Sequence, residues 1–435
     1  MGTVIGVSAV TVAVMILGIL RFPKIRLGRS EVSSYWVIVL LGALTLVALG
    51  QISPKQIGGA LLADSAINPF KILILFLSMT ILSIYLDEQG FFRYLADQTL
   101  RKAHASQTRL FVYLYLIVSV LTVFTSNDVI ILSFTPFICY FSKNARIDPI
   151  PYLATEFVAA NTWSMALIIG NPTNIYIGTA YGIGFVEYCR AMLLPTLLAG
   201  CVSFCTLYLL FRKSLREPVS GTPENVVIKD RLNFTVGLIH LAVCTVFLAV
   251  SSYIGLEMWA VSGIAVLCLF AVTLAVSMVR RSRPVALAAC LRRAPWQLVP
   301  FLLSMFVITM ALADKGVTSA IGNALGTDGV LLKYGMASFL GANVINNIPM
   351  SVLFCGIMEQ TGPAALTKAV YATIVGSNVG AFLTPIGALA GIMWSSILND
   401  HGLKFGYMNF LKIGVVAAFP ALLAAIAGLA ITLAV

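Results

Sequence analysis

Residues 110–141 read LFVYLYLIVSVLTVFTSNDVIILSFTPFICYF, an apolar stretch whose middle is interrupted by the polar run Thr-Ser-Asn-Asp at 125–128. Residues 335–358 read GMASFLGANVINNIPMSVLFCGIM and are interrupted in the same way by three asparagines. Lipid offers no hydrogen-bond partners, so a membrane segment must be helical, and a break in it is tolerated only where protein or water surrounds the break. Each stretch is therefore either two spans or one re-entrant helical hairpin.

The composition places these stretches in a membrane protein. The chain has 435 residues, of which 59% are hydrophobic and only 10% are charged, whereas about a quarter of a soluble domain is charged. This composition excludes a soluble enzyme, a disordered scaffold and a nucleic-acid-binding module. It predicts an all-α polytopic protein of the plasma (inner) membrane, surrounded by the lipid bilayer. The net charge of +11 is expected from basic cytoplasmic loops.

Ten more apolar segments approach the length of about 20 residues that a helix needs to cross a bilayer. They are 3–20, 35–50, 70–86, 155–186, 191–211, 234–253, 259–278, 297–313, 368–398 and 410–435. Two of them, 155–186 and 368–398, are long and are interrupted by Gly, Pro and Asn. Basic residues follow the first segment instead of preceding it, which predicts a retained first span that begins outside the cell.

The basic residues decide between the two interpretations of the broken stretches. If both stretches are hairpins, 22 of the 28 Lys and Arg residues fall on one side of the membrane. These residues lie in 21–29, 93–109, 143–146, 212–231 and 280–293 and at Lys404 and Lys412. Because basic residues collect in cytoplasmic loops, this asymmetry favours two hairpins, ten spans, and both termini outside.

The order of the segments repeats along the chain. We predict a first repeat at 1–211, a cytoplasmic linker at 212–231 and a second repeat at 232–435. Each repeat has three spans, a hairpin, an interrupted span and a last span; these last three segments are 110–141, 155–186 and 191–211 in the first repeat, and 335–358, 368–398 and 410–435 in the second. Five spans per repeat is an odd number, so the second repeat must be inverted. Inverted repeats whose broken helices meet near the midplane are typical of secondary transporters.

Four breaks, two in each repeat, combine amide and hydroxyl side chains with Gly and Pro. Proline breaks a helix and frees carbonyl oxygens. The N-termini of half-helices favour anions, and free carbonyl and amide oxygens favour cations. We predict that the breaks converge on one substrate and ion site. Its residues are Ser126, Asn127, Asp128, Asn161, Thr162, Gly170, Asn171, Thr173, Asn174, Asn346, Asn347, Asn378, Thr384 and Gly387.

Asp128 is the one acid expected deep in a hairpin, and an intramembrane carboxylate is a functional candidate by default. We expect it to take part in coupling to a proton or to sodium, since either cation suits a carboxylate with carbonyl oxygens nearby. Five other acids are expected near span ends, where solvent can stabilise their charge: Glu156, Glu187, Glu257, Asp314 and Glu359. The eight cysteines lack metal-ligand spacing and are expected to pack as small apolar residues, so no metal site is predicted.

The residues resemble the ion-transporter superfamily, most closely its arsenite permease (ArsB) branch. The resemblance covers most of the chain and is densest at 126–136, 160–162, 184–188, 346–349 and 383–390. It implies an elevator-type carrier, usually a homodimer, in which the first three spans of each repeat form a scaffold. The hairpins and interrupted spans would form the mobile unit and hold the ligand.

The break at 170–174 departs from that branch. Arsenite permeases tend to have a Ser-Asn-x-x-Asn break, whereas this chain has Gly-Asn-Pro-Thr-Asn, which resembles relatives that carry carboxylates or exchange sodium for protons. The fold is unaffected, but the same scaffold can carry different substrates.

Three functions remain open, and each takes a small inorganic or anionic solute as its partner. The first is efflux of arsenite or antimonite in exchange for protons, and the second is a sodium- or proton-coupled carrier of carboxylates or inorganic anions. The third is a membrane subunit that docks a soluble ATPase on the basic segments 212–231 and 280–293. No ATP-binding or hydrolase motif is present, so we expect no enzymatic activity and no cofactor besides the coupling proton or sodium ion.

Overall fold

The computed structural model describes residues 1–22, 24–27, 30–63, 68–103, 106–216, 228, 230–251 and 253–434. Over these residues the chain is helical apart from one β-hairpin, in which β1 (Lys24–Leu27) pairs antiparallel with β2 (Ser30–Ser33). Eight helical segments in the described part are long and apolar enough to cross a membrane. The composition therefore predicts the fold class correctly. Most of the predicted linker 212–231 lies outside the described residues.

The first half of the chain contains helices α1 to α10. They are α1 (Gly2–Arg21), α2 (Ser34–Ala48), α3 (Pro54–Leu62), α4 (Pro69–Glu88), α5 (Phe91–Lys102), α6 (Gln107–Phe124), α7 (Asn127–Ala145), α8 (Ile150–Trp163), α9 (Pro172–Ala180) and α10 (Phe185–Phe211). The first broken stretch thus becomes α6 and α7, and the first interrupted span becomes α8 and α9.

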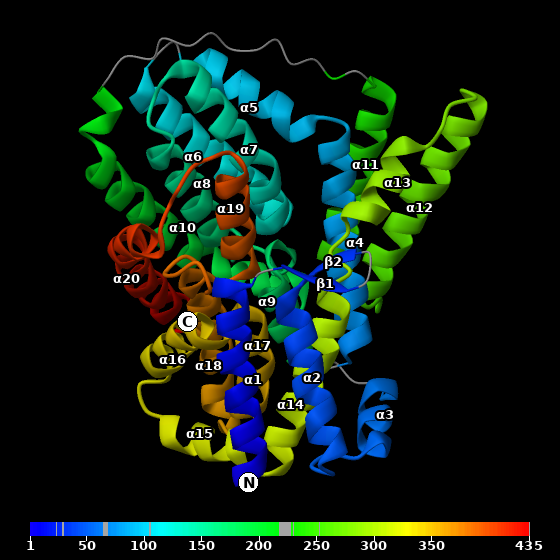
Figure 1. The fold of residues 1–435 in the computed structure, drawn as a ribbon, viewed down its shortest axis with the longest axis vertical. Helices are drawn as coiled ribbons and strands as arrows, with labels where there is room; N and C mark the ends of the chain where they lie inside the picture. The colour runs from blue at the N-terminus through cyan, green and yellow to red at the C-terminus, as the bar shows by residue number, and fades with distance from the viewer. Residues whose placement is uncertain are drawn as a thin grey trace.

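The second half contains helices α11 to α20 in a corresponding order. They are α11 (Arg231–Val250), α12 (Met258–Val279), α13 (Val285–Arg293), α14 (Leu298–Asp314), α15 (Val317–Leu325), α16 (Val330–Ile345), α17 (Asn347–Met358), α18 (Pro363–Gly380), α19 (Leu389–Asp400) and α20 (Tyr407–Thr432). In Figure 1, α1 begins at the lower end of the molecule and α11 at the upper end. The two halves therefore start from opposite ends of the structure.

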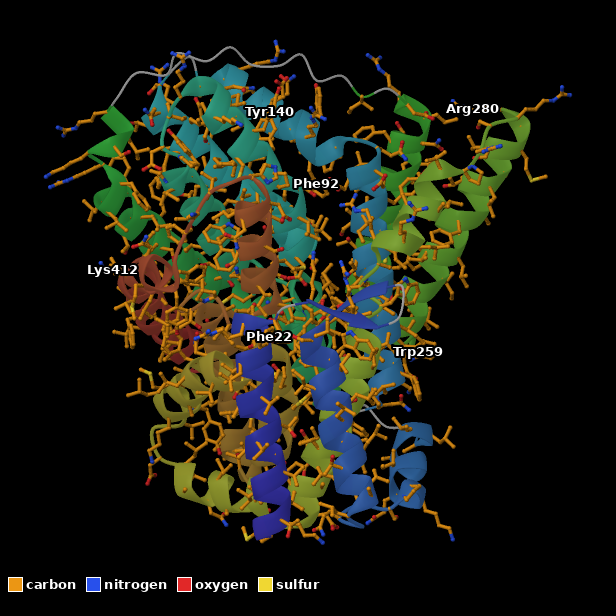
Figure 2. The ribbon with its side chains drawn as sticks, viewed as in Figure 1. Phe22, Phe92, Tyr140, Trp259, Arg280 and Lys412 are labelled. Carbon is orange, nitrogen blue, oxygen red and sulfur yellow. The ribbon has the colours of Figure 1, made fainter. Side chains whose placement is uncertain are left out.

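Helix contacts divide the fold into two groups. Helices α1, α2, α4, α11, α12 and α14 pack on one another, with α2 against α14 and α4 against α12. The broken stretches and interrupted spans pack among themselves and with α10 and α20. Figure 2 shows Trp259 and Arg280 at the two ends of α12, with the arginine at the upper end of the molecule.

Glycines let the helices of the second group approach closely. A Cβ atom on Gly376 of α18 would collide with the hydroxyl of Ser338 and the carbonyl oxygen of Gly335, both on α16. A Cβ atom on Gly428 of α20 would come within 2.7 Å of Pro195 Cα on α10. Helices in lipid associate by van der Waals packing, which small residues improve. The first contact holds the interrupted span of the second half against α16, and the second holds the last helix of that half against α10.

We predict that Gly376→Ala destabilises the protein. The added methyl group must separate α18 from the backbone of α16, and overpacking of this kind costs about 1–3 kcal/mol. Thermal unfolding of the purified protein in detergent measures the loss. Gly263→Ala on α12 is the matched control, because its new Cβ would meet only Ile74 Cγ2 at an ordinary 3.4 Å. Equal unfolding midpoints for the two variants would contradict the prediction.

Candidate functional site

Asn378 of α18 is the centre of a buried hydrogen-bond network that joins the two halves of the chain. Its Oδ1 accepts from Ser164 Oγ and from Asn171 Nδ2, each at 3.0 Å. Its Nδ2 donates to Asn174 Oδ1 at 2.6 Å and to the carbonyl oxygen of Ile374 at 2.8 Å. All these side chains are at most 1% exposed. One amide of the second half therefore fixes the first interrupted span on both sides of its break.

The break between α8 and α9 is closed by its own asparagines. Asn171 is the N-cap of α9, and its Oδ1 accepts from the backbone N–H and the hydroxyl of Thr173. Asn174 Nδ2 donates to the carbonyl oxygen of Ser164 at 2.9 Å and to that of Leu167 at 3.3 Å, which also accepts from the backbone N–H of Gly170. Gly170 is required because a Cβ there would collide with the carbonyl group of Ser164. The Gly-Asn-Pro-Thr-Asn run is thus a compact turn whose polar groups satisfy one another.

The tip of the first broken stretch docks on α8. Asn127, the first residue of α7, donates from Nδ2 to Asn161 Oδ1 at 3.0 Å, and Asn161 in turn donates to the carbonyl oxygen of Phe157. Three polar atoms here are buried without a partner among the described residues: Asn127 Oδ1, Ser126 Oγ and Thr162 Oγ1. Buried polar groups are nearly always paired, so such a concentration indicates a place where a ligand can bind.

The tip of the second broken stretch docks on the break between α18 and α19. Asn346 has a positive φ of 72°, its Nδ2 donates to the carbonyl oxygen of Ile386, and the N–H of Asn347 donates to the carbonyl oxygen of Gly387. Thr384 donates to Asn343 Oδ1 at 2.7 Å. The Asn347 Oδ1 atom is buried without a described partner. The tips thus match, since an asparagine at the first position of each second helix presents an unpaired carbonyl oxygen.

The structure groups the predicted site residues as follows. At the first tip, Asn127 pairs with Asn161. The central network consists of Ser164, Asn171, Thr173, Asn174 and Asn378. The second tip brings together Asn346, Asn347 and Gly387. Packing of α9 against α17 and α18 connects the last two groups. The connected side chains are all neutral, and the hydrogen bonds recorded for them include none to Lys, Arg or His of the described residues. The sequence analysis did not single out Ser164 for the site, although it borders the same break.

Asp128 lies apart from this network. Its side chain is half-buried at the start of α7 and has no hydrogen-bond partner among the described residues. It faces Tyr35 at the beginning of α2, close enough for the two groups to interact electrostatically. Tyr35 packs edge-on against Phe301 of α14, with ring centroids 5.1 Å apart. Asp128 is therefore within electrostatic reach of Tyr35 on α2, and Tyr35 itself packs on α14.

The expected position of Glu156 is wrong. Its side chain is fully buried, and both carboxylate oxygens accept from the hydroxyl of Thr135 on α7, at 2.9 and 3.1 Å. The predicted span began at residue 155, whereas α8 begins at Ile150, whose N–H is capped by Asp148. Five more helical residues move Glu156 about 7.5 Å inward along the helix. The other four acids expected at span ends are exposed: Glu187, Glu257, Asp314 and Glu359.

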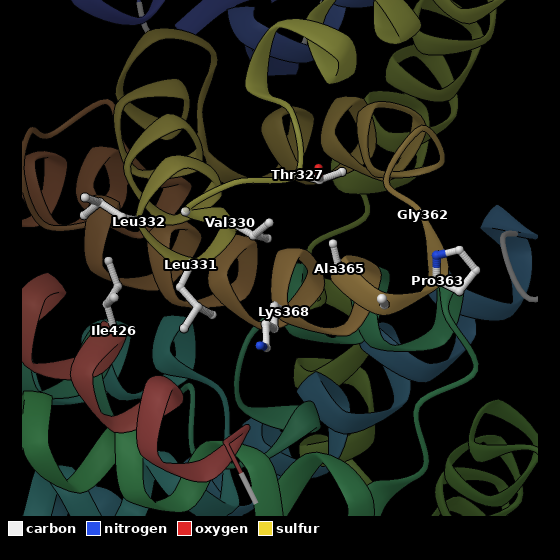
Figure 3. A pocket seen from close by; sticks show the side chains of 11 residues that line it. Thr327, Val330, Leu331, Leu332, Gly362, Pro363, Ala365, Lys368 and Ile426 are labelled. Carbon is white, nitrogen blue, oxygen red and sulfur yellow. The ribbon is translucent and has the colours of Figure 1, made fainter.

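A cavity of about 710 Å³ opens away from this site, between the first turns of α16 and α18 and the side of α20 (Figure 3). Its lining includes Gly329, Pro363, Lys368 and Ile426, and none of the predicted site residues. It does not account for the polar atoms without partners. Among the described residues, no group of three or more His, Cys, Asp or Glu side chains is placed to hold a metal ion.

We predict that Asn378→Ala destabilises the protein by several kcal/mol. The substitution leaves one donor, Asn171 Nδ2, and one acceptor, Asn174 Oδ1, buried without partners, and each such group costs about 1–3 kcal/mol. Thermal unfolding in detergent is the measurement. Asn399→Ala at the exposed end of α19 serves as control and should leave the unfolding midpoint unchanged. A midpoint for Asn378→Ala equal to that of the control would show that the network does not hold the halves together.

Comparison with known proteins finds related membrane transport proteins. A family model described as citrate transporter matches residues 27–376. The arsenical pump membrane protein of Yersinia enterocolitica is 28% identical over 83% of this chain and 86% of its own length. The protein of the same name from Escherichia coli K12 is 28% identical over 82% and 85%, respectively.

A solved structure has a similar fold. The crystal structure of the YdaH transporter of Alcanivorax borkumensis superimposes with a TM-score of 0.54, covering 99% of this chain and 98% of that one. The two sequences are 13% identical. At this level of identity the likeness concerns the arrangement of the helices alone.

Proposed function

Because the chain belongs to the citrate transporter family and is a multi-pass membrane transporter, we propose that it exports arsenite or antimonite in exchange for protons. The relatives named arsenical pump membrane proteins cover more than four fifths of the chain and support this substrate. The observation that best supports this substrate is that the amide network contains no charged side chain. A citrate-like polyanion would need basic side chains or bound cations, whereas a neutral trihydroxide needs only hydrogen-bond donors and acceptors.

The unpaired polar atoms offer the binding groups. Asn127 Oδ1 and Asn347 Oδ1 are buried acceptors for hydroxyl donors of the solute, and the hydroxyls of Ser126 and Thr162 can donate or accept. Binding would satisfy groups that the protein alone leaves unpaired. No basic side chain is needed in this arrangement.

In the proposed carrier, the two groups of helices move relative to each other. The repeats 1–211 and 232–435 are inverted, their first three spans form the scaffold of a homodimer, and the broken stretches and interrupted spans move against it. Asp128 stands where these groups meet, next to Tyr35 of α2. Exchange of a proton at this carboxylate would couple the movement to the proton gradient. The end of the molecule that carries Arg280, which is the upper end in Figure 2, faces the cytoplasm, and both termini lie outside.

A second candidate is a sodium- or proton-coupled carrier of carboxylates or inorganic anions. Two observations favour it: the helices α7, α9 and α17 all begin within the site, and helix N-termini favour anions. Unpaired amide oxygens such as Asn127 Oδ1 are suitable ligands for sodium. The match to the citrate transporter family agrees with this function as well.

A soluble ATPase partner receives less support from the described residues. Arg293 of the basic segment 280–293 is engaged by Asp87 and Glu88 at the end of α4, and Arg280 binds Asp230 at 3.0 Å. These two side chains serve contacts within the chain. Co-purification of an ATPase and transport that requires its ATP hydrolysis would establish this third function.

The substrate is tested by thermal shift of the detergent-purified protein. Arsenite, antimonite, citrate, succinate, sulfate and silicate are each added with and without sodium. A ligand that binds only the native state raises the unfolding midpoint, and the rise grows with the logarithm of ligand concentration once that concentration exceeds Kd. We expect arsenite or antimonite to stabilise the protein without sodium. Stabilisation only by an anion with sodium would replace the first proposal with the second.

We predict that Asp128→Asn abolishes proton-driven transport and leaves the fold intact. In proteoliposomes with an acidic interior and the membrane potential held at zero, the native protein should accumulate arsenite as protons leave. The neutral amide cannot exchange a proton, so the gradient should no longer drive accumulation. Asp400→Asn, at the exposed end of α19, is the control that retains a normal rate. Normal accumulation by Asp128→Asn would remove this residue from the mechanism.

A further inference from the structure

Glu156 is a fully buried carboxyl group with little to stabilise a charge. It lies on α8, in the interior of the second group of helices, and its one recorded donor is the Thr135 hydroxyl on α7. The indole N–H of Trp394 on α19 lies near this carboxyl group and is buried without a hydrogen-bond partner in the described structure. Three helices of the proposed mobile unit therefore meet at one carboxyl group.

The surroundings of Glu156 contain no basic side chain among the described residues that contact it. A titratable side chain near enough to interact electrostatically with Glu156 is the thiol of Cys139, which lies one turn beyond Thr135 on α7. The tyrosines on α6, α8, α10 and α18 have other neighbours. Tyr115 donates to the Gly200 carbonyl oxygen, Tyr152 to Gln107 Oε1 and Tyr188 to the Met165 carbonyl oxygen, and Tyr371 lies beside Tyr188.

Burial of an unpaired carboxylate is costly, and a protein avoids the cost by protonating the group. The neighbouring cavity is lined by Phe157, Trp394 and Phe410 and measures about 20 Å³, enough for roughly one water molecule. Glu156 itself is 0% exposed, so bulk water does not reach it in this arrangement. Removal of its proton requires α7, α8 and α19 to change their packing.

We propose that Glu156 is a second proton-carrying site of the transporter, in addition to Asp128. The step breaks the carboxylic O–H bond and passes the proton to water when the junction of α7, α8 and α19 opens toward one side. The resulting carboxylate takes a proton from water later in the cycle, when the junction opens toward the other side. This inference rests on the proposed proton exchange: Glu156 exchanges its proton only in a cycle in which Asp128 exchanges its own, and it adds one proton to that cycle.

The test measures how steeply accumulation depends on the pH gradient. With the membrane potential held at zero, each proton exchanged supports about a tenfold solute gradient per pH unit. In proteoliposomes given arsenite, we expect Glu156→Gln to lower the gradient supported by one pH unit about tenfold. Arsenite-for-arsenite exchange should continue, because it moves no net proton. The exposed Glu187→Gln variant is the control and should keep the native slope.

Infrared spectroscopy gives a readout that does not depend on the solute. The native protein should show the carbonyl stretch of a protonated carboxylic acid that Glu156→Gln lacks and Glu187→Gln retains. Thr135→Val should shift the pH at which this band disappears, and Thr135→Ser should not, since serine keeps the hydroxyl. These threonine variants test the site even if Glu156→Gln does not fold.

The outcomes separate the two proposals. A native slope of accumulation in Glu156→Gln, or an unchanged band, would overturn the role of Glu156 and leave the proposed function standing. A Glu156 band that responds to pH in a protein that transports no arsenite would overturn the proposed substrate and support the proton site.

Discussion

The structure depends on how the polar groups at its helix breaks find partners. Where a helix stops inside a membrane, several carbonyl and N–H groups lose their helical partners, and lipid cannot replace them. In this structure asparagine side chains supply the missing partners. Asn174 donates to carbonyl oxygens of the α8–α9 break, Asn346 to the carbonyl oxygen of Ile386, and Asn343 to that of Gly380. An amide suits this task because it donates and accepts at once and carries no charge. The site is therefore built from the groups that make the breaks possible.

The same solution makes the two halves of the chain interdependent. The Asn378 amide belongs to the second half and completes the break in the first, while Gly376 allows α18 to lie directly on α16. Such contacts are stiff, since a buried amide that loses one partner pays the full cost of desolvation. A rigid unit with a few unpaired acceptors at its tips, Asn127 Oδ1 and Asn347 Oδ1, suits a carrier that moves its site as a body.

Much of this arrangement follows from the sequence, because polar residues at membrane depth are few and have functions by default. The breaks, the turn residues and the asparagines of the network are all visible as interruptions of apolar runs. Their pairing is not, because it depends on which helices face each other; nothing in the sequence indicates that Asn378 binds Asn171. Glu156 shows the second limit. Its depth is set by where α8 begins, and the prolines at 149 and 151 conceal a helical start at Ile150 that Asp148 caps.

The two membrane carboxyl groups occupy contrasting environments, and this contrast bears on coupling. Asp128 is half-buried at the contact with α2, where a small displacement of the first tip changes its access to water. Glu156 is enclosed by α7, α8 and α19 and exchanges its proton only when their packing changes. In the proposed carrier, a group at the contact between the two groups of helices would sense the position of the mobile unit, whereas a group in its interior would sense its internal packing. Solute bound at the proposed site would touch Asn127 and Asn161, and Asn161 lies about one and a half turns from Glu156 along α8. Binding and protonation therefore act on the same pair of helices, which is the physical requirement for one to affect the other.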